Sequence, residues 1–202
     1  MAITTVIFDL HGVLLFTTRS TFSGMLAERL GVPVEQVQQV MNGPVNVLWD
    51  LGEVSDDDFY DHMLAETGQP PEKKRIIEKF VIEDFYIDQE MLALIRELHK
   101  THTTVLLSNF PAHVREFLQK VWFIDGAFDH HIISSEVKLL KPDARIYQLA
   151  LERAACQPGE AVFIDDRPEN VEGAEALGIK GILFTSKVQT ISDLGRVLKA
   201  AR

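Results

Sequence analysis

Cysteine is almost absent from this chain of 202 residues, which contains only Cys156. A single cysteine excludes a disulfide within the chain and is typical of a reducing compartment, so we expect a cytoplasmic protein. The start of the sequence lacks the pattern of a signal peptide, and no apolar run approaches membrane-spanning length. We therefore expect neither secretion nor a membrane anchor.

Basic residues are also few, since 20 Lys and Arg face 30 Asp and Glu and give a formal net charge of −10. Nucleic acids and anionic membranes would repel such a chain, and we expect neither as a partner. A bound cation or a lysine can reverse the field inside one cleft, so an anionic substrate remains compatible with this charge.

Five short apolar runs have the character of buried strands, each ending at polar or turn residues. Apolar residues at helical spacing, such as Met91, Ile95 and Leu98, fill the intervals between the later runs. This alternation predicts an α/β fold with a doubly wound, mostly parallel, Rossmann-like five-stranded sheet. The expected strands are residues 3–8, 104–107, 131–133, 161–164 and 180–184.

The stretch of residues 14–88 interrupts the alternation, because one helical pattern follows another without a convincing buried strand. Ser55 to Asp58 has the form of a capping box, so we interpret the acidic run there as a helix start, not a metal site. The sequence predicts a helical cap domain of residues 14–88, inserted into a core domain of residues 1–13 and 89–202.

Two of the expected strands end in aspartate. Asp9 follows the first strand, with His11 and Gly12 beyond it, and the strand at 161–164 runs into Asp165 and Asp166. Each aspartate alone could be a turn residue or a helix cap. Adjacent carboxylates repel each other, however, and Mg²⁺ commonly binds one or two carboxylates together with a substrate phosphate.

Two further polar segments are associated with strands. Ser108 and Asn109 end the second strand, where they could hold a phosphate oxygen, and Lys141 precedes Pro142 and a helix start, where it could neutralise phosphate and acids. Either segment alone could be an ordinary loop. All four segments lie on the carboxyl side of predicted strands, however, where ligands bind in open parallel sheets.

The four segments at 8–13, 107–109, 141–143 and 164–166 resemble, in order, the four motifs of the haloacid dehalogenase-like superfamily. The helical insertion resembles the first cap type of that superfamily (subfamily I). The longer phrases at 140–147 and 163–171 are similar to the branch of glucose-1-phosphate phosphatase-like proteins and the N-terminal phosphatase domain of soluble epoxide hydrolases. The resemblance implies a Mg²⁺-dependent phosphoric monoester hydrolase acting on a small phosphorylated metabolite, as a monomer or homodimer.

The resemblance also implies residue roles. Asp9 would attack phosphorus and become an aspartyl phosphate, Ser108 and the backbone of Asn109 would hold phosphate oxygens, and Lys141 would balance charge. The implied Mg²⁺ ligands are Asp9, the main-chain carbonyl of His11, Asp166 and, as a helper, Asp165.

The sequence departs from the family pattern at His11, where phosphatases of this superfamily usually carry a second aspartate as acid and base. Loss of such a group costs on the order of 10²–10⁴ in rate. Histidine titrates near pH 6.5 when unperturbed, and we hypothesise that His11 substitutes in part. The alternative that His11 only fills the turn stays open.

Two other functions remain open. A 2-haloacid dehalogenase would use the same aspartate without a metal, but Asp165 and Asp166 would then repel its carboxylate substrate. A binding or regulatory module that kept the fold is supported by His11 alone. Phe16, Arg19, Trp49 and His113 are candidates for the pocket mouth, although packing is the simpler interpretation of Phe16 and Trp49.

Overall fold

The computed structural model describes residues 2–200, and its centre is a five-stranded sheet with the order β5-β4-β1-β6-β7. Every neighbouring pair of strands is parallel, which confirms the predicted doubly wound α/β fold. Each strand overlaps its predicted range. The strands are β1 (Thr5–Phe8), β4 (Thr103–Ser108), β5 (His130–Ile133), β6 (Ala161–Asp165) and β7 (Lys180–Leu183).

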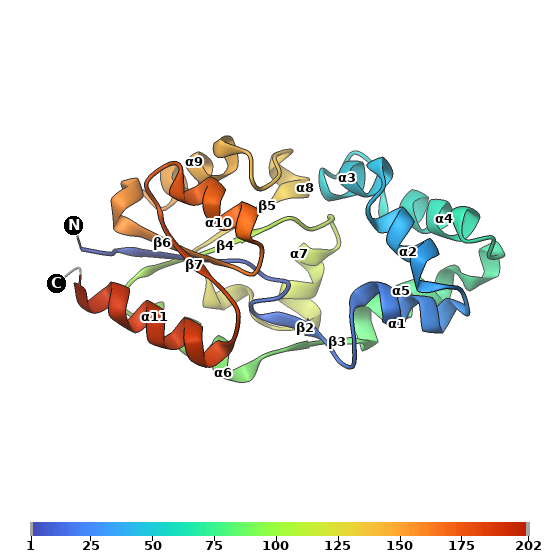
Figure 1. Cartoon of the computed structure of the whole chain (residues 1–202), viewed down its shortest axis with the longest axis horizontal. Coiled ribbons are helices and arrows are strands. Elements are labelled where there is room, and N and C mark those ends of the chain that lie inside the picture. Colours follow the sequence, from blue (N-terminus) through green and yellow to red (C-terminus); the bar gives the residue numbers. More distant parts are fainter. Residues whose placement is uncertain (1, 201–202) are drawn as a thin grey trace.

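Alternation of side chains along the strands gives the sheet two buried faces. Phe8 belongs to a hydrophobic cluster with residues of α6 and α11, whereas its neighbour Ile7 packs with residues of α9 and α10. Figure 1 shows the two helix pairs on opposite sides of the sheet. These helices are α6 (Gln89–Leu98), α9 (Ala144–Arg153), α10 (Pro168–Glu175) and α11 (Lys187–Ala200).

Five further helices gather at the end of the molecule opposite the chain termini (Figure 1). They have a hydrophobic core of their own, which includes the buried side chains of Leu26, Phe59 and Phe80. The Ser55 hydroxyl accepts a hydrogen bond from the backbone N–H of Asp58 and caps α4, as the capping pattern predicts. The helices are α1 (Phe22–Leu30), α2 (Val34–Met41), α3 (Pro44–Asp50), α4 (Asp56–Glu66) and α5 (Lys74–Glu83).

Sequence analysis missed two short strands between these helices and the sheet domain. Strands β2 (Leu15–Thr17) and β3 (Phe85–Ile87) pair antiparallel, with Leu15 opposite Ile87. Three residues are too few to show a strand periodicity. The pairing joins the two chain segments that connect the helical bundle to the sheet.

The remaining helices are short and follow β4 and β5. They are α7 (Val114–Glu116), which continues into a π-helical turn at Phe117–Val121, and α8 (Ser134–Val137). Across residues 2–200, no helix has both the length and the apolar character needed to cross a membrane.

Candidate active site

The centre of the site is a buried lysine between two aspartates. Lys141 Nζ lies 2.7 Å from Asp9 Oδ1 and 2.6 Å from Asp165 Oδ2, and it also donates to the carbonyl oxygen of Leu107 at 3.0 Å. The ammonium group has three N–H donors, and each therefore has an acceptor. The side chains of Lys141 and Asp165 are 2% and 0% exposed, so solvent hardly screens these ion pairs.

Asp9 follows β1 directly, at the carboxyl edge of the sheet. Burial raises the pKa of Asp9, the attraction of Lys141 opposes this shift, and repulsion from Asp165 adds to it. The ion pair with Lys141 favours the ionised carboxylate, which is the form that a nucleophile requires.

Asp166 completes a cluster of three acids. Asp9, Asp165 and Asp166 each offer a carboxylate oxygen, and these oxygens all lie within 4.8 Å of one another. Partial burial and repulsion from Asp165 raise the pKa of Asp166, although it stays open to solvent. Lys141 neutralises only one of the three charges. This oxygen-rich, negatively charged cluster fits a hard divalent cation such as Mg²⁺.

Asp165 and Asp166 differ in how many protein donors they meet. Asp165 accepts from Lys141, from the backbone N–H of Arg167 at 2.8 Å and from Asn170 Nδ2 at 3.0 Å. It thus also anchors the first turn of α10, which begins at Pro168. Asp166 is the more accessible of the two carboxylates.

Ser108 and Asn109 end β4 beside the lysine. The Ser108 hydroxyl is buried and has no hydrogen-bond partner among the described residues, so it is available to a bound phosphate. The Asn109 side chain accepts from the backbone N–H of Lys141 at 2.8 Å and donates to its carbonyl at 3.0 Å. Sequence analysis missed this positioning role, because the partners are 32 residues apart.

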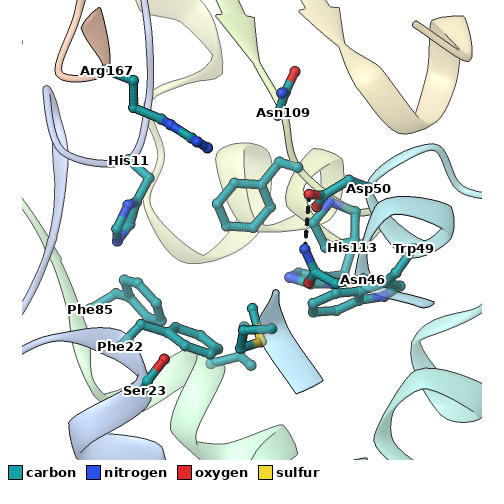
Figure 2. Close-up of a pocket in the computed structure, with 14 residues that line it drawn as sticks. His11, Phe22, Ser23, Asn46, Trp49, Asp50, Phe85, Asn109, His113 and Arg167 are labelled. Atoms are coloured by element: carbon teal, nitrogen blue, oxygen red, sulfur yellow. Dashed lines mark hydrogen bonds between the residues drawn. The ribbon is translucent and has the colours of Figure 1, made fainter. Parts of the chain in front are cut away.

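A pocket of about 320 Å³ opens between the helical bundle and the sheet domain (Figure 2). One end of the pocket is nearest the acids. It is lined by His11 and Asn109, which belong to the motif segments, and by Arg167, which follows Asp166. Of the four residues considered for the mouth, Trp49 and His113 line the pocket. Phe16 instead packs against Tyr86 and Phe184, and Arg19 pairs with Glu28.

His11 stands at the position where a carboxylate is usual. Its ring lies edge-on to Phe85, with the centroids 6.0 Å apart, and it lines the pocket. Surrounding protein atoms lower the pKa of His11, and attraction from Asp9 partly offsets this. The imidazole is therefore mainly neutral at pH 7.

Comparisons with known proteins show which family the chain belongs to. The haloacid dehalogenase-like hydrolase family model matches residues 3–178, and the chain belongs to this family of hydrolases. The chain is 25% identical over 193 residues to a sesquiterpene phosphatase from Aspergillus oryzae, with 95% of each chain covered. It is 29% identical over 206 residues to a phosphorylated carbohydrates phosphatase from Thermotoga maritima, covering 96% of this chain and 90% of the relative.

A solved structure supports the same fold. A haloacid dehalogenase family enzyme from Bacteroides thetaiotaomicron, crystallised with magnesium and inorganic phosphate, superposes with a TM-score of 0.76. The match covers 90% of this chain and 94% of the chain of that enzyme, and the two sequences are 24% identical.

Proposed function

We propose that this hydrolase is a Mg²⁺-dependent phosphatase of small phosphate monoesters, which acts through an aspartyl phosphate on Asp9. The observation that carries the proposal is the buried Lys141 between Asp9 and Asp165, next to the Ser108 hydroxyl, which has no partner in the part of the chain that the structure describes. The two phosphatases similar to nearly the whole chain add support.

The contacts of Asp9 suggest which atom reacts. Lys141 holds Oδ1, so Oδ2 is the oxygen that attacks phosphorus in the proposed reaction. A new Asp9–phosphorus bond forms as the ester P–O bond breaks, and the departing alkoxide takes a proton from the protonated form of His11 or from water. Water then attacks the aspartyl phosphate, which releases inorganic phosphate and restores the carboxylate.

Three further groups would stabilise the phosphoryl oxygens. The Ser108 hydroxyl and the backbone N–H of Asn109 would donate hydrogen bonds, and Lys141 would balance the charge that accumulates. The Asn109 side chain acts one step away, because it fixes the backbone of Lys141.

The acids would hold the metal. Asp9, Asp166 and the main-chain carbonyl of His11 are the proposed Mg²⁺ ligands, with Asp165 as a helper. When bound, Mg²⁺ supplies the positive charge that lets a phosphate dianion approach three carboxylates. Gly12 leaves room for this arrangement, because a Cβ there would meet the carboxylate of Asp166.

We further propose that His11 replaces part of the missing acid–base function, on the ground that it lines the pocket two residues beyond Asp9. Esters with a good leaving group need no proton from the enzyme and would react fastest. A metal-free dehalogenase is less well supported, since Asp165 and Asp166 would face a carboxylate substrate without a second cation.

The direct test is phosphate release from a panel of esters, including an activated aryl phosphate, with Mg²⁺ and with a chelator. We expect release that requires Mg²⁺ and disappears in Asp9→Asn. If no ester releases phosphate but Mg²⁺ raises the melting temperature, the chain is a binding module. Chloride release from 2-chloroacids in the presence of chelator would establish the dehalogenase instead.

A further inference from the structure

The wall of the pocket contributed by the helical bundle and its neighbours is strongly apolar. Phe22, Met41 and Trp49 come from the bundle, and Phe85 and Phe110 complete the surface. Hydroxyl groups placed against such a wall would lose their hydrogen bonds to water without replacement. The wall therefore suits a leaving group with an apolar body, and 320 Å³ is at the small end for ligand pockets.

Asn46, Asp50 and His113 bring polar atoms to the side of the pocket away from His11 and Arg167 (Figure 2). Asn46 Nδ2 donates to Asp50 Oδ2 at 3.4 Å, whereas Asn46 Oδ1 is enclosed by protein and has no partner among the described residues. Asn46 therefore positions Asp50, and the carboxylate of Asp50 is the acceptor that this side of the pocket presents.

Hydrogen bonds to Asp56 hold His113 and Trp49 in the wall. His113 Nδ1 lies 2.9 Å from Asp56 Oδ1 and donates to this carboxylate. Nε2 is buried and has no partner among the described residues. The indole of Trp49 also donates to Asp56 at 2.7 Å, which holds this part of the wall in place.

Positive charge is scarce in the pocket. Among its lining residues, Arg167 is the one lysine or arginine, and it lies across from Asp50 in Figure 2. A second phosphate or a carboxylate at the far end of the substrate would meet the carboxylate of Asp50. The pocket therefore disfavours substrates with a second anionic group.

We propose that the pocket takes the phosphate monoester of a mainly apolar alcohol, about one ring in size, whose far end carries a single hydrogen-bond donor. Asp50 determines this specificity, since its carboxylate meets the donor, which is a hydroxyl or amino group, and Asn46 positions that carboxylate. The inference rests on the proposed phosphatase function for the position of the phosphate. It favours an apolar body over a polyhydroxylated one.

Equilibrium binding of non-hydrolysable phosphonates to the wild-type protein with Mg²⁺ tests the inference without turnover. The probes are methylphosphonate, 4-methylbenzylphosphonate, 4-(hydroxymethyl)benzylphosphonate and the isosteric phosphonate of glucose 6-phosphate. We expect the methylbenzyl probe to bind roughly tenfold or more tighter than methylphosphonate because its ring is buried. The hydroxymethyl probe should gain about another tenfold in affinity, because its hydroxyl donates a hydrogen bond to the carboxylate of Asp50.

Two variants test which residues cause the preference among the probes. Asn46→Leu should reduce the advantage of the hydroxymethyl over the methyl probe, and the matched control Asn42→Leu changes an exposed asparagine outside the pocket. Phe22→Ala should weaken both benzyl probes, whereas Phe123→Ala, at a side chain 72% exposed, should not.

Tighter binding of the glucose analogue than of the methylbenzyl probe, or equal affinity for all four, would overturn the inference. Failure of the proposed function is a separate result. If the expected order of binding holds while no ester releases phosphate, the inference about the pocket stands and the phosphatase proposal fails.

Discussion

Gly12 and Asp166 approach so closely that a Cβ at Gly12 would lie 2.4 Å from Asp166 Oδ2. Gly12 also has a φ of +86°, which side chains other than hydrogen rarely tolerate. The first motif therefore shapes the acidic cluster, which is the proposed metal site, through the absence of a side chain as well as through the carboxylate of Asp9.

We predict that Gly12→Ala displaces the carboxylate of Asp166, weakens Mg²⁺ binding at least tenfold and costs about 1–3 kcal/mol of stability. Mg²⁺ titrations of phosphate release and thermal unfolding measure the two effects. Gly126→Ala is the matched control, because nothing lies within 4 Å of a Cβ at that glycine. An unchanged Mg²⁺ titration in Gly12→Ala would contradict the assignment of Asp166.

Lys141→Met should unfold at markedly lower denaturant and lose phosphate release. Removal of the ammonium leaves Asp9 and Asp165 buried without their cation, and breaking a buried pair in this way costs about 3–5 kcal/mol. The loss should be smaller at pH 5 than at pH 8, since protonation relieves unpaired carboxylates. Lys120→Met serves as the control at an exposed pair, and equal stability of both variants would refute the central role of Lys141.

Asp50 should make stability depend on pH. Burial raises its pKa from 3.8 to about 6, with Arg167 opposing, so the folded state holds the proton more tightly than the unfolded state. The stabilisation is complete below about pH 3.8 and is lost as pH rises through about 6, by about 3 kcal/mol in all. Asp50→Asn should remove this part of the slope between pH 4 and 6.5 in urea unfolding. Parallel curves for wild type and variant would show that Asp50 is not responsible.

Restoring an acid at position 11 should speed the reaction of poor leaving groups. We expect His11→Asp to raise kcat on alkyl phosphates by roughly 10²-fold, with a smaller change on activated aryl phosphates that leave without a proton. His11→Ala should slow alkyl esters relative to wild type. Equal rates for wild type and His11→Ala on alkyl esters would show that the histidine only fills the turn.

The sequence was sufficient for the fold because its strands are short apolar runs that end in polar residues. Parallel order then places those ends at one edge of the sheet. The sequence alone therefore predicts that Asp9, Ser108 and the pair at 165–166 lie close together. The helix cap at Ser55 could be predicted from the sequence for a similar reason, since its hydrogen bond to Asp58 spans only three residues.

Contacts between distant segments were decided by the tertiary structure alone. Lys141 lies 132 positions beyond Asp9. The sequence suggested that this lysine could neutralise acids, but it did not show that one ammonium contacts both Asp9 and Asp165. The same holds for Asn109, whose amide holds the backbone of Lys141, and for the bond between Asn46 and Asp50 in the pocket. Local periodicity and capping act over a few residues, whereas a site depends on which side chains the packed chain brings within hydrogen-bond distance.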